Sequence, residues 1–410
     1  MKTPSLQILA VLALILAGCK PAPLPSPALL ASQTPAAIGT QTPPLHPGVP
    51  SPTSPSPALA RLSFEHKARA RVGDHPTSIV SGDFDRDGDL DFAIANDGDG
   101  QGKTVSIVIN DGRQHFSESA AVEVGVEPIA LASGDWDADG DLDLAVANHL
   151  SDDIAILTNN GRGRFSEASR VTMPDNSYPF MMASGDFDQD DDVDISVANF
   201  IEQGAVSILS NDGRGGFVES ARVPVGGNPY SVAAGDFDGD GDLDLAASNS
   251  AVNTVTIVRN DAREGFVMSW RANVGERPWM LVPGDFDGDQ DMDLAVANED
   301  SDDVSILRND GQGGFTTASV VPVGDEPYSV TAGDFDRDGD LDLAVANEGS
   351  STISIAVNDG NGKFATTATL AAGEEPWWII TDDVDGDGDL DLAVANSESD
   401  DISIWLNVAG

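Results

Sequence analysis

A nine-residue acidic phrase recurs seven times in this chain, and no other feature constrains the fold as strongly. It is clearest at residues 236–244, which read Asp-Phe-Asp-Gly-Asp-Gly-Asp-Leu-Asp. The copies begin at Asp83, Asp135, Asp186, Asp236, Asp285, Asp334 and Asp383, so successive starts are 52, 51, 50, 49, 49 and 49 residues apart. A fixed period of about 50 residues indicates a repeat architecture, in which each unit buries its apolar face against its neighbours. Seven such units account for residues 61–410.

Each unit contains four short runs that are typical of strands. In the sixth unit these runs are 328–332, 341–346, 353–357 and 364–371, and the acidic phrase lies between the first two. The third run ends in Asn-Asp-Gly, which supplies the positive backbone angles of a tight hairpin. Four antiparallel strands repeated seven times predict an all-β fold, a seven-bladed β-propeller.

The two ends of the repeat region indicate how the ring closes. The seventh unit ends with its third strand at 402–407, and only three residues follow. The segment 62–72 precedes the first acidic phrase and has the character of a fourth strand. We predict that this N-terminal strand completes the last blade and removes an open sheet edge. The alternative, an open solenoid, would need terminal caps that the sequence does not show.

Residues 1–18 have the pattern of a signal peptide, with Lys2 followed by an uncharged run at 8–17 that is too short to span a membrane. The peptide ends in Leu-Ala-Gly-Cys, which resembles the bacterial lipobox. The resemblance implies cleavage before Cys19 and lipidation of this residue, the only cysteine of the chain. We therefore expect a protein of the bacterial cell envelope, surface or periplasm facing, that meets the membrane through its lipid anchor only. An ordinary secreted precursor is the alternative.

Residues 19–60 differ in composition from the repeats. Twelve of the 24 prolines lie in 20–60, and this segment has no acidic residue. Such a segment cannot bury enough apolar surface to offset its ordering entropy. Pro-rich chains extend by ~3.1 Å per residue, so this tether could reach on the order of 100 Å. We predict a disordered stalk that holds the propeller of residues 61–410 away from a membrane.

The charge balance excludes some partners. The chain has 69 acidic against 21 basic residues and a formal net charge of −48. Nucleic acid is bound by basic surfaces that release counterions from phosphates, so we expect no nucleic-acid partner. A single cysteine excludes an intramolecular disulfide framework and any paired-cysteine zinc or redox site.

The acidic phrases have the composition of calcium loops. Aspartates at alternate positions of a tight turn converge on one point, and the sixth residue, Gly88 in the first copy, must turn sharply. The pattern resembles the first half of an EF-hand loop, but the twelfth position is Ile94, Val146 and Val197 in the first three copies rather than a bidentate Glu. We predict up to seven Ca²⁺ ions, one per blade, whose binding is coupled to folding. Magnesium is less suited to an all-protein cage, and a purely solubilising role is the other alternative.

The candidate calcium ligands are the aspartates at positions one, three, five, seven and nine of the loops. They are Asp83, Asp85, Asp87, Asp89 and Asp91; Asp135, Asp137, Asp139, Asp141 and Asp143; Asp186, Asp188, Asp190, Asp192 and Asp194; Asp236, Asp238, Asp240, Asp242 and Asp244; Asp285, Asp287, Asp289, Asp291 and Asp293; Asp334, Asp336, Asp338, Asp340 and Asp342; and Asp383, Asp385, Asp387, Asp389 and Asp391.

The motif Asp-x-Asp-x-Asp-Gly-x-x-Asp, with Val-Gly-x-x-Pro before it and Ala-Asn after it, resembles the FG-GAP or VCBS-type repeat, whose superfamily includes the integrin α-subunit propellers. The resemblance covers residues 61–410. It implies that positions one, three, five and nine bind Ca²⁺ through their side chains and position seven through its carbonyl. Asp191 and Gln290 replace the glycine at position six, so we expect the third and fifth sites to be the weakest.

One face of the propeller is expected to carry the Val-Gly-x-x-Pro loops, and ligands usually approach this face in the family. The residues after the prolines are Thr77, Ile129, Phe180, Tyr230, Trp279, Tyr328 and Trp377. Five of these seven are aromatic. They either pack between blades as core or ring the mouth of the central channel as a binding surface for sugar rings or a protein partner.

The sequence leaves three classes of function open. We predict a monomeric binding or adhesion module for a protein or glycan ligand on the face opposite the calcium loops, and not an enzyme. A polysaccharide-active enzyme or accessory subunit is one alternative, because aspartates are abundant enough to supply a catalytic pair. A passive scaffold of a surface assembly is the other. The five histidines follow no repeat, and His75 is the one expected on the candidate face.

Overall fold

The structure is a computed structural model, and it describes residues 62–261 and 265–408. The predicted signal peptide 1–18 and stalk 19–60, including Cys19, lie outside these residues. The described part contains 28 β-strands. None of the described residues belongs to a helix long and apolar enough to cross a membrane.

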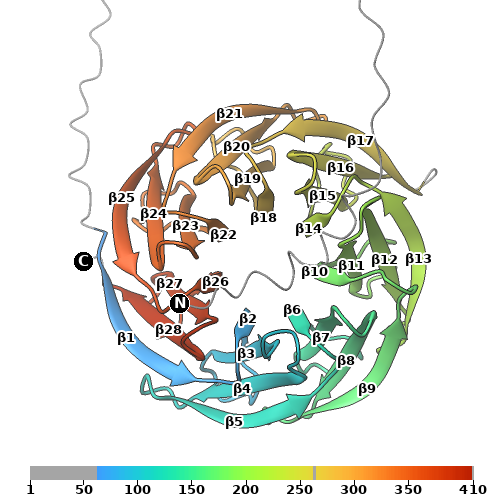
Figure 1. The fold of residues 1–410 in the computed structure, drawn as a ribbon, viewed down its shortest axis with the longest axis vertical. Helices are drawn as coiled ribbons and strands as arrows, with labels where there is room; N and C mark the ends of the chain where they lie inside the picture. Colours follow the sequence, from blue (N-terminus) through green and yellow to red (C-terminus); the bar gives the residue numbers. More distant parts are fainter. Residues whose placement is uncertain (1–61, 262–264, 409–410) are drawn as a thin grey trace, which may run out of the picture. The chain divides into compact units, whose positions relative to one another are not determined.

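The strands form seven antiparallel sheets of four, arranged as blades around a common axis (Figure 1). From the innermost strand outward, blade 1 is β2 (Pro76–Gly82), β3 (Asp91–Asn96), β4 (Thr104–Asn110) and β5 (Phe116–Glu123); blade 2 is β6 (Pro128–Gly134), β7 (Asp143–Asn148), β8 (Asp153–Asn159) and β9 (Phe165–Thr172); blade 3 is β10 (Pro179–Gly185), β11 (Asp194–Asn199), β12 (Ala205–Asn211) and β13 (Phe217–Pro224); blade 4 is β14 (Pro229–Gly235), β15 (Asp244–Asn249), β16 (Thr254–Asp261) and β17 (Gly265–Asn273); blade 5 is β18 (Pro278–Gly284), β19 (Asp293–Asn298), β20 (Asp303–Asn309) and β21 (Phe315–Pro322); blade 6 is β22 (Pro327–Gly333), β23 (Asp342–Asn347), β24 (Thr352–Asn358) and β25 (Phe364–Ala371); and blade 7 is β26 (Pro376–Asp382), β27 (Asp391–Asn396), β28 (Asp401–Asn407) and β1 (Phe64–Arg71). The predicted seven-bladed β-propeller is confirmed.

The ring closes as predicted, because β1 from the start of the repeat region is the outermost strand of the last blade. It pairs antiparallel with β28, from Phe64 opposite Asn407 to Arg71 opposite Asp401. Backbone hydrogen bonds extend the pairing on both sides, from Val72 to the carbonyl of Asp400 and from Val408 to that of Ser63. β28 therefore has a partner on each side, and the last blade has four strands like the others.

The position of each strand in its blade explains its residue pattern. The second strand of blade 6, β23, is buried at all six positions, because neighbouring blades cover both of its faces. The outermost strand β25 has one solvated face, and its exposed residues include Thr366 and Thr367. A strand buried on both faces reads as a continuous apolar run, whereas a half-buried strand carries polar residues on its open face.

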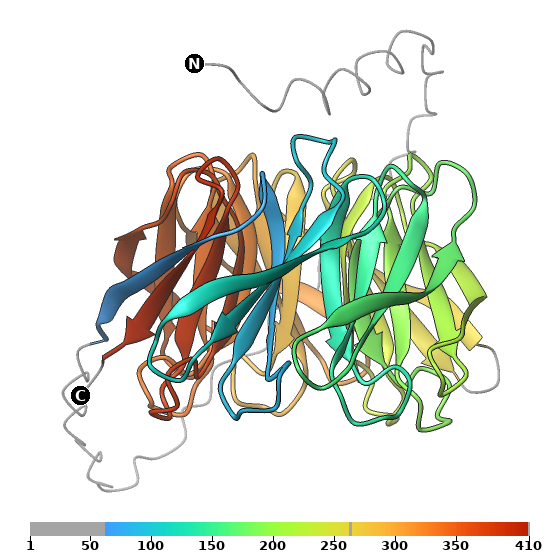
Figure 2. The same cartoon turned by 90° about the horizontal axis from the view of Figure 1, so that it is seen from below.

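The blade registers sort the loops onto two opposite faces of the ring (Figure 2). In blade 6, Pro327 pairs with Asn347, and Asn347 pairs with Thr352, so these strand ends lie together. Gly333 pairs with Asp342 at the other end, where the acidic loop lies. We call the face with the acidic loops and Asn-Asp-Gly hairpins the aspartate face. The opposite face, with the Val-Gly-x-x-Pro loops and the turns after the second strands, is the proline face.

The asparagine of Asn-Asp-Gly links neighbouring blades. Of the three residues Asn358, Asp359 and Gly360 at the end of β24, only Gly360 has a positive φ, which is 73°. The side chain of Asn358 instead donates from Nδ2 to the carbonyl of Phe286 in the preceding blade, at 2.8 Å. Every blade has this bond: Asn110 to Val384, Asn159 to Phe84, Asn211 to Trp136, Asn260 to Phe187, Asn309 to Phe237, Asn358 to Phe286 and Asn407 to Phe335. The longest, 3.4 Å, crosses the seam between blades 7 and 1.

Substitution of Asn309 by Ala should test this link. Asn309 is buried and donates from Nδ2 to Phe237 at 2.8 Å and to Met292 at 3.1 Å. Without the amide, the buried carbonyl of Phe237 has no donor, which costs about 1–3 kcal/mol of unfolding free energy. Thermal unfolding should show the loss, whereas Gln312→Ala, at an exposed position of the same hairpin, should leave the melting temperature unchanged. Equal melting temperatures for both variants would contradict the inter-blade role.

Candidate functional site

The ninth aspartate anchors each acidic loop through hydrogen bonds to the backbone. In the fourth loop this is Asp244, which is 1 % exposed and accepts the backbone N–H of Phe237 at 3.1 Å and of Asn260 at 2.7 Å. The first aspartate, Asp236, accepts the N–H groups of Gly239 and Gly241. The ninth carboxylate thus ties the loop to the end of the third strand, and the first shapes the turn.

The first, third and ninth carboxylates converge. In the first four loops, one oxygen from each of these three aspartates lies within 4.8 Å of the other two. These groups are Asp83, Asp85 and Asp91; Asp135, Asp137 and Asp143; Asp186, Asp188 and Asp194; and Asp236, Asp238 and Asp244. Oδ1 of the third aspartate is buried and accepts no hydrogen bond in four loops, at Asp85, Asp238, Asp287 and Asp336. A buried carboxylate oxygen without a donor, facing other carboxylates, is suited to coordinate a cation.

The pKa values of the loop aspartates indicate that these carboxylates lack a compensating positive charge. Burial raises the pKa of the ninth aspartate in every loop, to about 7 in Asp91, Asp244, Asp293, Asp342 and Asp391 and to about 6 in Asp143 and Asp194. Burial also raises the pKa of the third aspartate, as for Asp238, where the charge of Asp240 adds to the effect. A hard divalent cation bound by oxygen ligands would supply the missing charge, so the residues fit Ca²⁺.

The seventh side chain points out of this group of carboxylates. A Cβ on the hairpin glycine Gly311 would come within 2.5 Å of Oδ2 of Asp291, so the seventh carboxylate lies against the hairpin of its own blade. In some loops, the side chain at position four of the preceding loop also contacts this carboxylate. Arg86 contacts Asp141 at 2.5 Å, and Gln189 contacts Asp242. Position seven therefore has only its backbone carbonyl available to bind a cation. The fifth aspartate, Asp240, accepts the N–H of Asp242 at 3.0 Å and is outside the three-residue groups.

Two positions in each loop have positive φ. Position six was expected, and it includes Asp191 at 71° and Gln290 at 75°. Position four was not expected, and there glycine occurs in three loops only, while Gln189 has a φ of 62°. The third loop therefore has no glycine at either position, although this conformation is strained for residues with a side chain. The structure makes the third loop the most strained of the seven.

The aromatic residues that follow the prolines pack against one another. The rings of Tyr230, Trp279 and Tyr328 form a stack with centroid distances of 3.9 and 4.3 Å, and Phe180 and Trp377 meet Trp279 edge-on. The first four of these side chains are 4–9 % exposed, and Trp377 is half-buried. Thr77 and Ile129, at the same position of blades 1 and 2, are also buried. This burial favours the packing interpretation, and a role of these residues in ligand binding stays a prediction.

The proline face also holds seven residue pairs that the sequence analysis missed. In each blade the residue before the proline has a positive φ, and its carbonyl accepts the N–H of the residue that follows the second strand. The pairs are His75 with Asp97, Glu127 with His149, Tyr178 with Phe200, Asn228 with Ser250, Arg277 with Glu299, Glu326 with Glu348, and Glu375 with Ser397. The sequence offered one signal. The proline and the asparagine are the same in all seven blades, whereas the residue before the proline and the residue after the asparagine differ from blade to blade and are often charged.

Several carboxyl groups of these pairs are held away from water. Burial raises the pKa of Glu348 to about 9, and its hydrogen bond with Glu326 adds to the effect. Burial raises the pKa of Glu127 and of Glu299 to about 7, although Arg277 lies 2.7 Å from Glu299. At neutral pH the Glu348 carboxyl is therefore protonated and can donate a hydrogen bond. The proline face offers both neutral carboxyl groups and carboxylates.

Comparison with known families agrees with the loop geometry. FG-GAP-like repeats match the chain at residues 83–146, 135–197, 186–247, 236–296, 285–345 and 334–394. The chain belongs to the FG-GAP-like repeat family. Each match begins at the first aspartate of one loop and ends within the second strand of the next blade, so the six FG-GAP-like matches contain all seven loops. No curated protein matches the chain.

Solved structures similar to this FG-GAP-like propeller share its fold at low identity. BBS1N, crystallised in complex with ARL6DN, is 15 % identical with a TM-score of 0.61, over 85 % of this chain and 99 % of that one. A second crystal of that complex gives 14 % identity and a TM-score of 0.61, over 84 % and 96 % of the two chains. A protein from Lactobacillus plantarum is 14 % identical with a TM-score of 0.59, over 75 % of this chain and 88 % of that one.

Proposed function

We propose that this FG-GAP-like propeller is a calcium-stabilised binding module of the bacterial cell envelope, which captures a protein or a glycan on its proline face. The family and the fold are those of a general binding or scaffold module. Calcium, the envelope location and the ligand class go beyond the family and rest on the arguments below. We propose binding rather than catalysis, by one copy of the chain.

The calcium part of the proposal rests on the acidic loops. The first, third and ninth carboxylates of a loop converge, and the third has an oxygen without a donor in four loops. When bound, calcium supplies the positive charge that these buried carboxylates lack. The chain's own residues hold the ligands in place, because the ninth aspartate is anchored by two backbone N–H groups, as Asp244 is by Phe237 and Asn260.

The observation that carries the binding function is the pair Glu326 and Glu348 on the proline face. A hydrogen bond joins the carboxyl groups of Glu326, which is exposed, and Glu348, which is half-buried, and burial disfavours the charge of Glu348. Such an arrangement lowers the stability of the fold, and domains retain it where the groups serve recognition. A neutral Glu348 can donate a hydrogen bond to a sugar hydroxyl or a peptide carbonyl, and neighbouring carboxylates can accept one.

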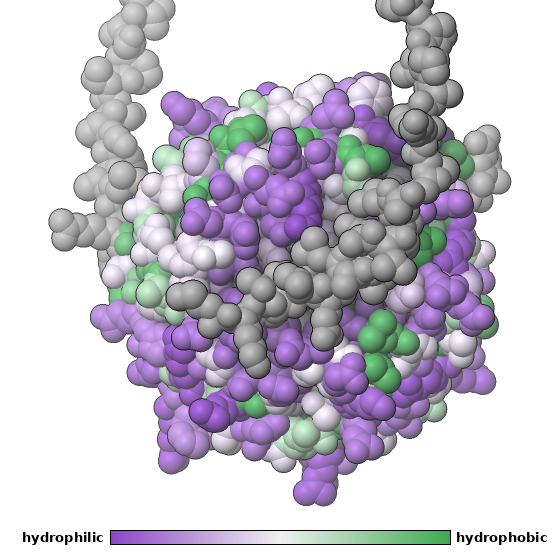
Figure 3. Space-filling model, in the orientation of Figure 1, coloured by the Kyte–Doolittle hydropathy of each residue, from purple (hydrophilic) through white to green (hydrophobic). Residues whose placement is uncertain are grey.

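The surface character and one structural neighbour are consistent with polar recognition of a partner. The face seen in Figure 3 is mostly hydrophilic, and its hydrophobic residues form small separate patches. Polar surfaces of this kind recognise partners through hydrogen bonds and charge. BBS1N was crystallised in a complex with ARL6DN, so a propeller of this fold occurs in a complex. Attachment through Cys19 and the stalk 19–60 would tether the propeller to the membrane.

Substitution of Glu348 by Gln should change stability and binding in opposite directions. The folded state holds a proton on Glu348 up to about pH 9, whereas the ordinary pKa of the side chain is 4.5. The folded state therefore binds more protons than the unfolded state between these values, and this group lowers stability as pH rises through that window. Glutamine removes the effect, so Glu348→Gln should melt a few degrees higher than wild type at pH 8 and equally at pH 4.5.

The same variant tests the binding face. Residues 61–410, immobilised with and without Ca²⁺, are presented to a glycan array and to detergent-solubilised envelope proteins. The wild type and His115→Ala, on the aspartate face, should capture the same ligand, and Glu348→Gln should lose it while remaining folded. Undiminished capture by Glu348→Gln would place the site elsewhere. Turnover of a polysaccharide by the wild type would favour the enzyme alternative.

A further inference from the structure

A buried histidine lies at the seam where the ring closes. His75 stands immediately before β2 of blade 1 and is 8 % exposed. Its backbone N–H donates to Oδ1 of Asp400, in the loop between β27 and β28 of blade 7, at 3.1 Å. From the sequence, His75 was expected on the proline face. The structure shows in addition that it is buried between two blades.

A buried carboxylate orients the imidazole of His75. Nδ1 lies 2.5 Å from Oδ1 of Asp97, which is itself 3 % exposed, and the ring meets Trp377 edge-on at 5.5 Å. With a proton on Nδ1 directed at Asp97, Nε2 would keep its lone pair for a ligand. Among the described residues, none forms a hydrogen bond with Nε2. A carboxylate on one imidazole nitrogen with the other nitrogen free is the arrangement found behind metal-binding histidines.

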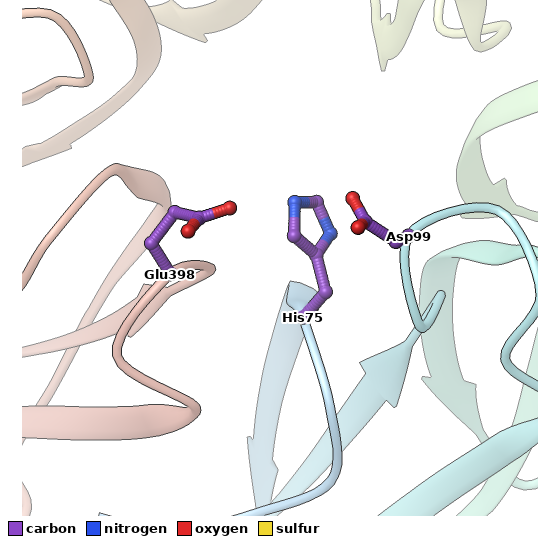
Figure 4. A group of neighbouring side chains, drawn as sticks. All are labelled: His75, Asp99 and Glu398. Carbon is purple, nitrogen blue, oxygen red and sulfur yellow. The ribbon is translucent and has the colours of Figure 1, made fainter. Parts of the chain in front are cut away.

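Two further carboxylates converge on this histidine from different blades. Asp99 comes from the loop between β3 and β4, and Glu398 from the loop between β27 and β28. One ligand atom from each of His75, Asp99 and Glu398 lies within 4.8 Å of the other two. Figure 4 shows the imidazole between the two carboxylates. Both carboxylates are exposed, so their side chains can close on an ion while the buried imidazole stays in place.

We propose that His75, Asp99 and Glu398 form a second class of metal site, which binds a divalent transition ion such as Zn²⁺ rather than Ca²⁺. One imidazole nitrogen and two carboxylate oxygens are a ligand set that Zn²⁺ accepts, with water in the open position. Ca²⁺ prefers oxygen ligands only, as the acidic loops provide. Asp97 is a positioning residue, because it acts through His75. This proposal depends neither on the calcium loops nor on the ligand of the proline face.

The charge around the site favours a cation. The carboxylates that act electrostatically on the imidazole are those of Asp97, Asp99, Glu127, Glu375 and Glu398. The alternative is an imidazolium that is simply ion-paired with Asp97, Asp99 and Glu398. Both arrangements use the same side chains, but only the first retains a transition metal.

A metal here would fasten the joint at which the ring closes. The site joins blade 7 to blade 1, where the inter-blade bond from Asn110 to Val384 is the longest of the seven, at 3.4 Å. Glu398 belongs to the last blade and His75 to the first, so one ion would connect the two ends of the repeat region. Ion binding should therefore raise the temperature at which the closed ring opens.

Isothermal titration of residues 61–410 with Zn²⁺, in saturating Ca²⁺, tests the proposal. The wild type should bind one Zn²⁺ that His75→Ala does not bind, and the melting temperature of the wild type alone should rise on addition of Zn²⁺. His115→Ala removes an exposed histidine of the aspartate face and should behave as wild type. Asp97→Asn should bind the same ion with about 10- to 100-fold lower affinity.

A second variant separates loss of the site from loss of the fold. Glu398→Gln changes an exposed side chain, so the propeller should fold, and the Zn²⁺ stoichiometry should still fall by one. Cobalt substitution should give visible absorption in the wild type that is absent from both His75→Ala and Glu398→Gln. Equal Zn²⁺ stoichiometry in the wild type and these two variants, or no Zn²⁺ binding by the wild type in saturating Ca²⁺, would overturn the proposal.

Discussion

Removal of calcium should lower the melting temperature of residues 61–410 more than any single substitution. A site whose free ligand is 100-fold above its Kd stabilises the folded state by about 2.7 kcal/mol, so three filled loops would contribute about 8 kcal/mol. In a domain of this size we expect a fall of about 10 °C or more on chelation, reversed by Ca²⁺. Differential scanning calorimetry with EGTA, then with excess Ca²⁺, measures it directly.

Substitution within the fourth loop should separate metal binding from structure. Asp238 has a buried oxygen without a donor, and burial together with Asp240 raises the pKa of its carboxyl. Asp238→Ala removes this unfavourable charge, so it should stabilise the metal-free protein. In Ca²⁺ it should destabilise, because one site is lost, by about 2.7 kcal/mol at 100-fold excess over Kd. The change of sign between the two conditions is what metal coordination predicts.

A matched control lies in the same loop. The side chain of Asp242 points toward Gln189 of the neighbouring loop, and only its carbonyl remains available to the ion. Asp242→Ala should therefore leave calcium stoichiometry unchanged. If EGTA does not move the melting temperature, or if Asp238→Ala has the same sign with and without Ca²⁺, the acidic loops are not calcium sites.

Deletion of β1 should open the ring. A chain that begins at residue 73 loses seven pairs of residues between β1 and β28, the ion pair of Arg69 with Asp401 at 3.1 Å, and the contact of Phe64 with Phe335. At about 1 kcal/mol net for each hydrogen bond, the backbone contribution alone amounts to several kcal/mol. The exposed edge of β28 would also be free to pair with other chains. We expect a large fall in melting temperature together with concentration-dependent aggregation.

Controls for this deletion come from the same region. A chain that begins at residue 61 retains β1 and should melt as the full chain does. A peptide of residues 62–72, added to the truncated protein, should pair with β28 and restore the melting temperature, as in strand addition elsewhere. Ala70→Asp in the full propeller places a charge at a position that is 4 % exposed and should weaken the same joint. A truncated protein that stays monomeric and equally stable would contradict closure by β1.

The sequence predicted those features that repeat with each unit. The blade count followed from seven starts about 50 residues apart, and the closing strand from a fourth run that stands before the first loop instead of after the last. The aspartates at alternate positions were expected to converge because they lie within nine residues of one another, where local turn geometry determines proximity, and the first, third and ninth do so in the first four loops. These contacts are formed inside a unit, so their spacing is visible in every copy.

Only the tertiary structure decided the contacts between units. Asn358 was expected to serve a turn, yet its amide bonds Phe286, 72 residues earlier. The aromatic residues were left between core and binding surface, and the stack of Tyr230, Trp279 and Tyr328 favours core. His75 was expected on the proline face, but its contacts gave no signal, since its partners Asp97 and Glu398 do not recur. Packing of one blade on the next determines such contacts, and a repeat shows in its sequence only what each unit does alone.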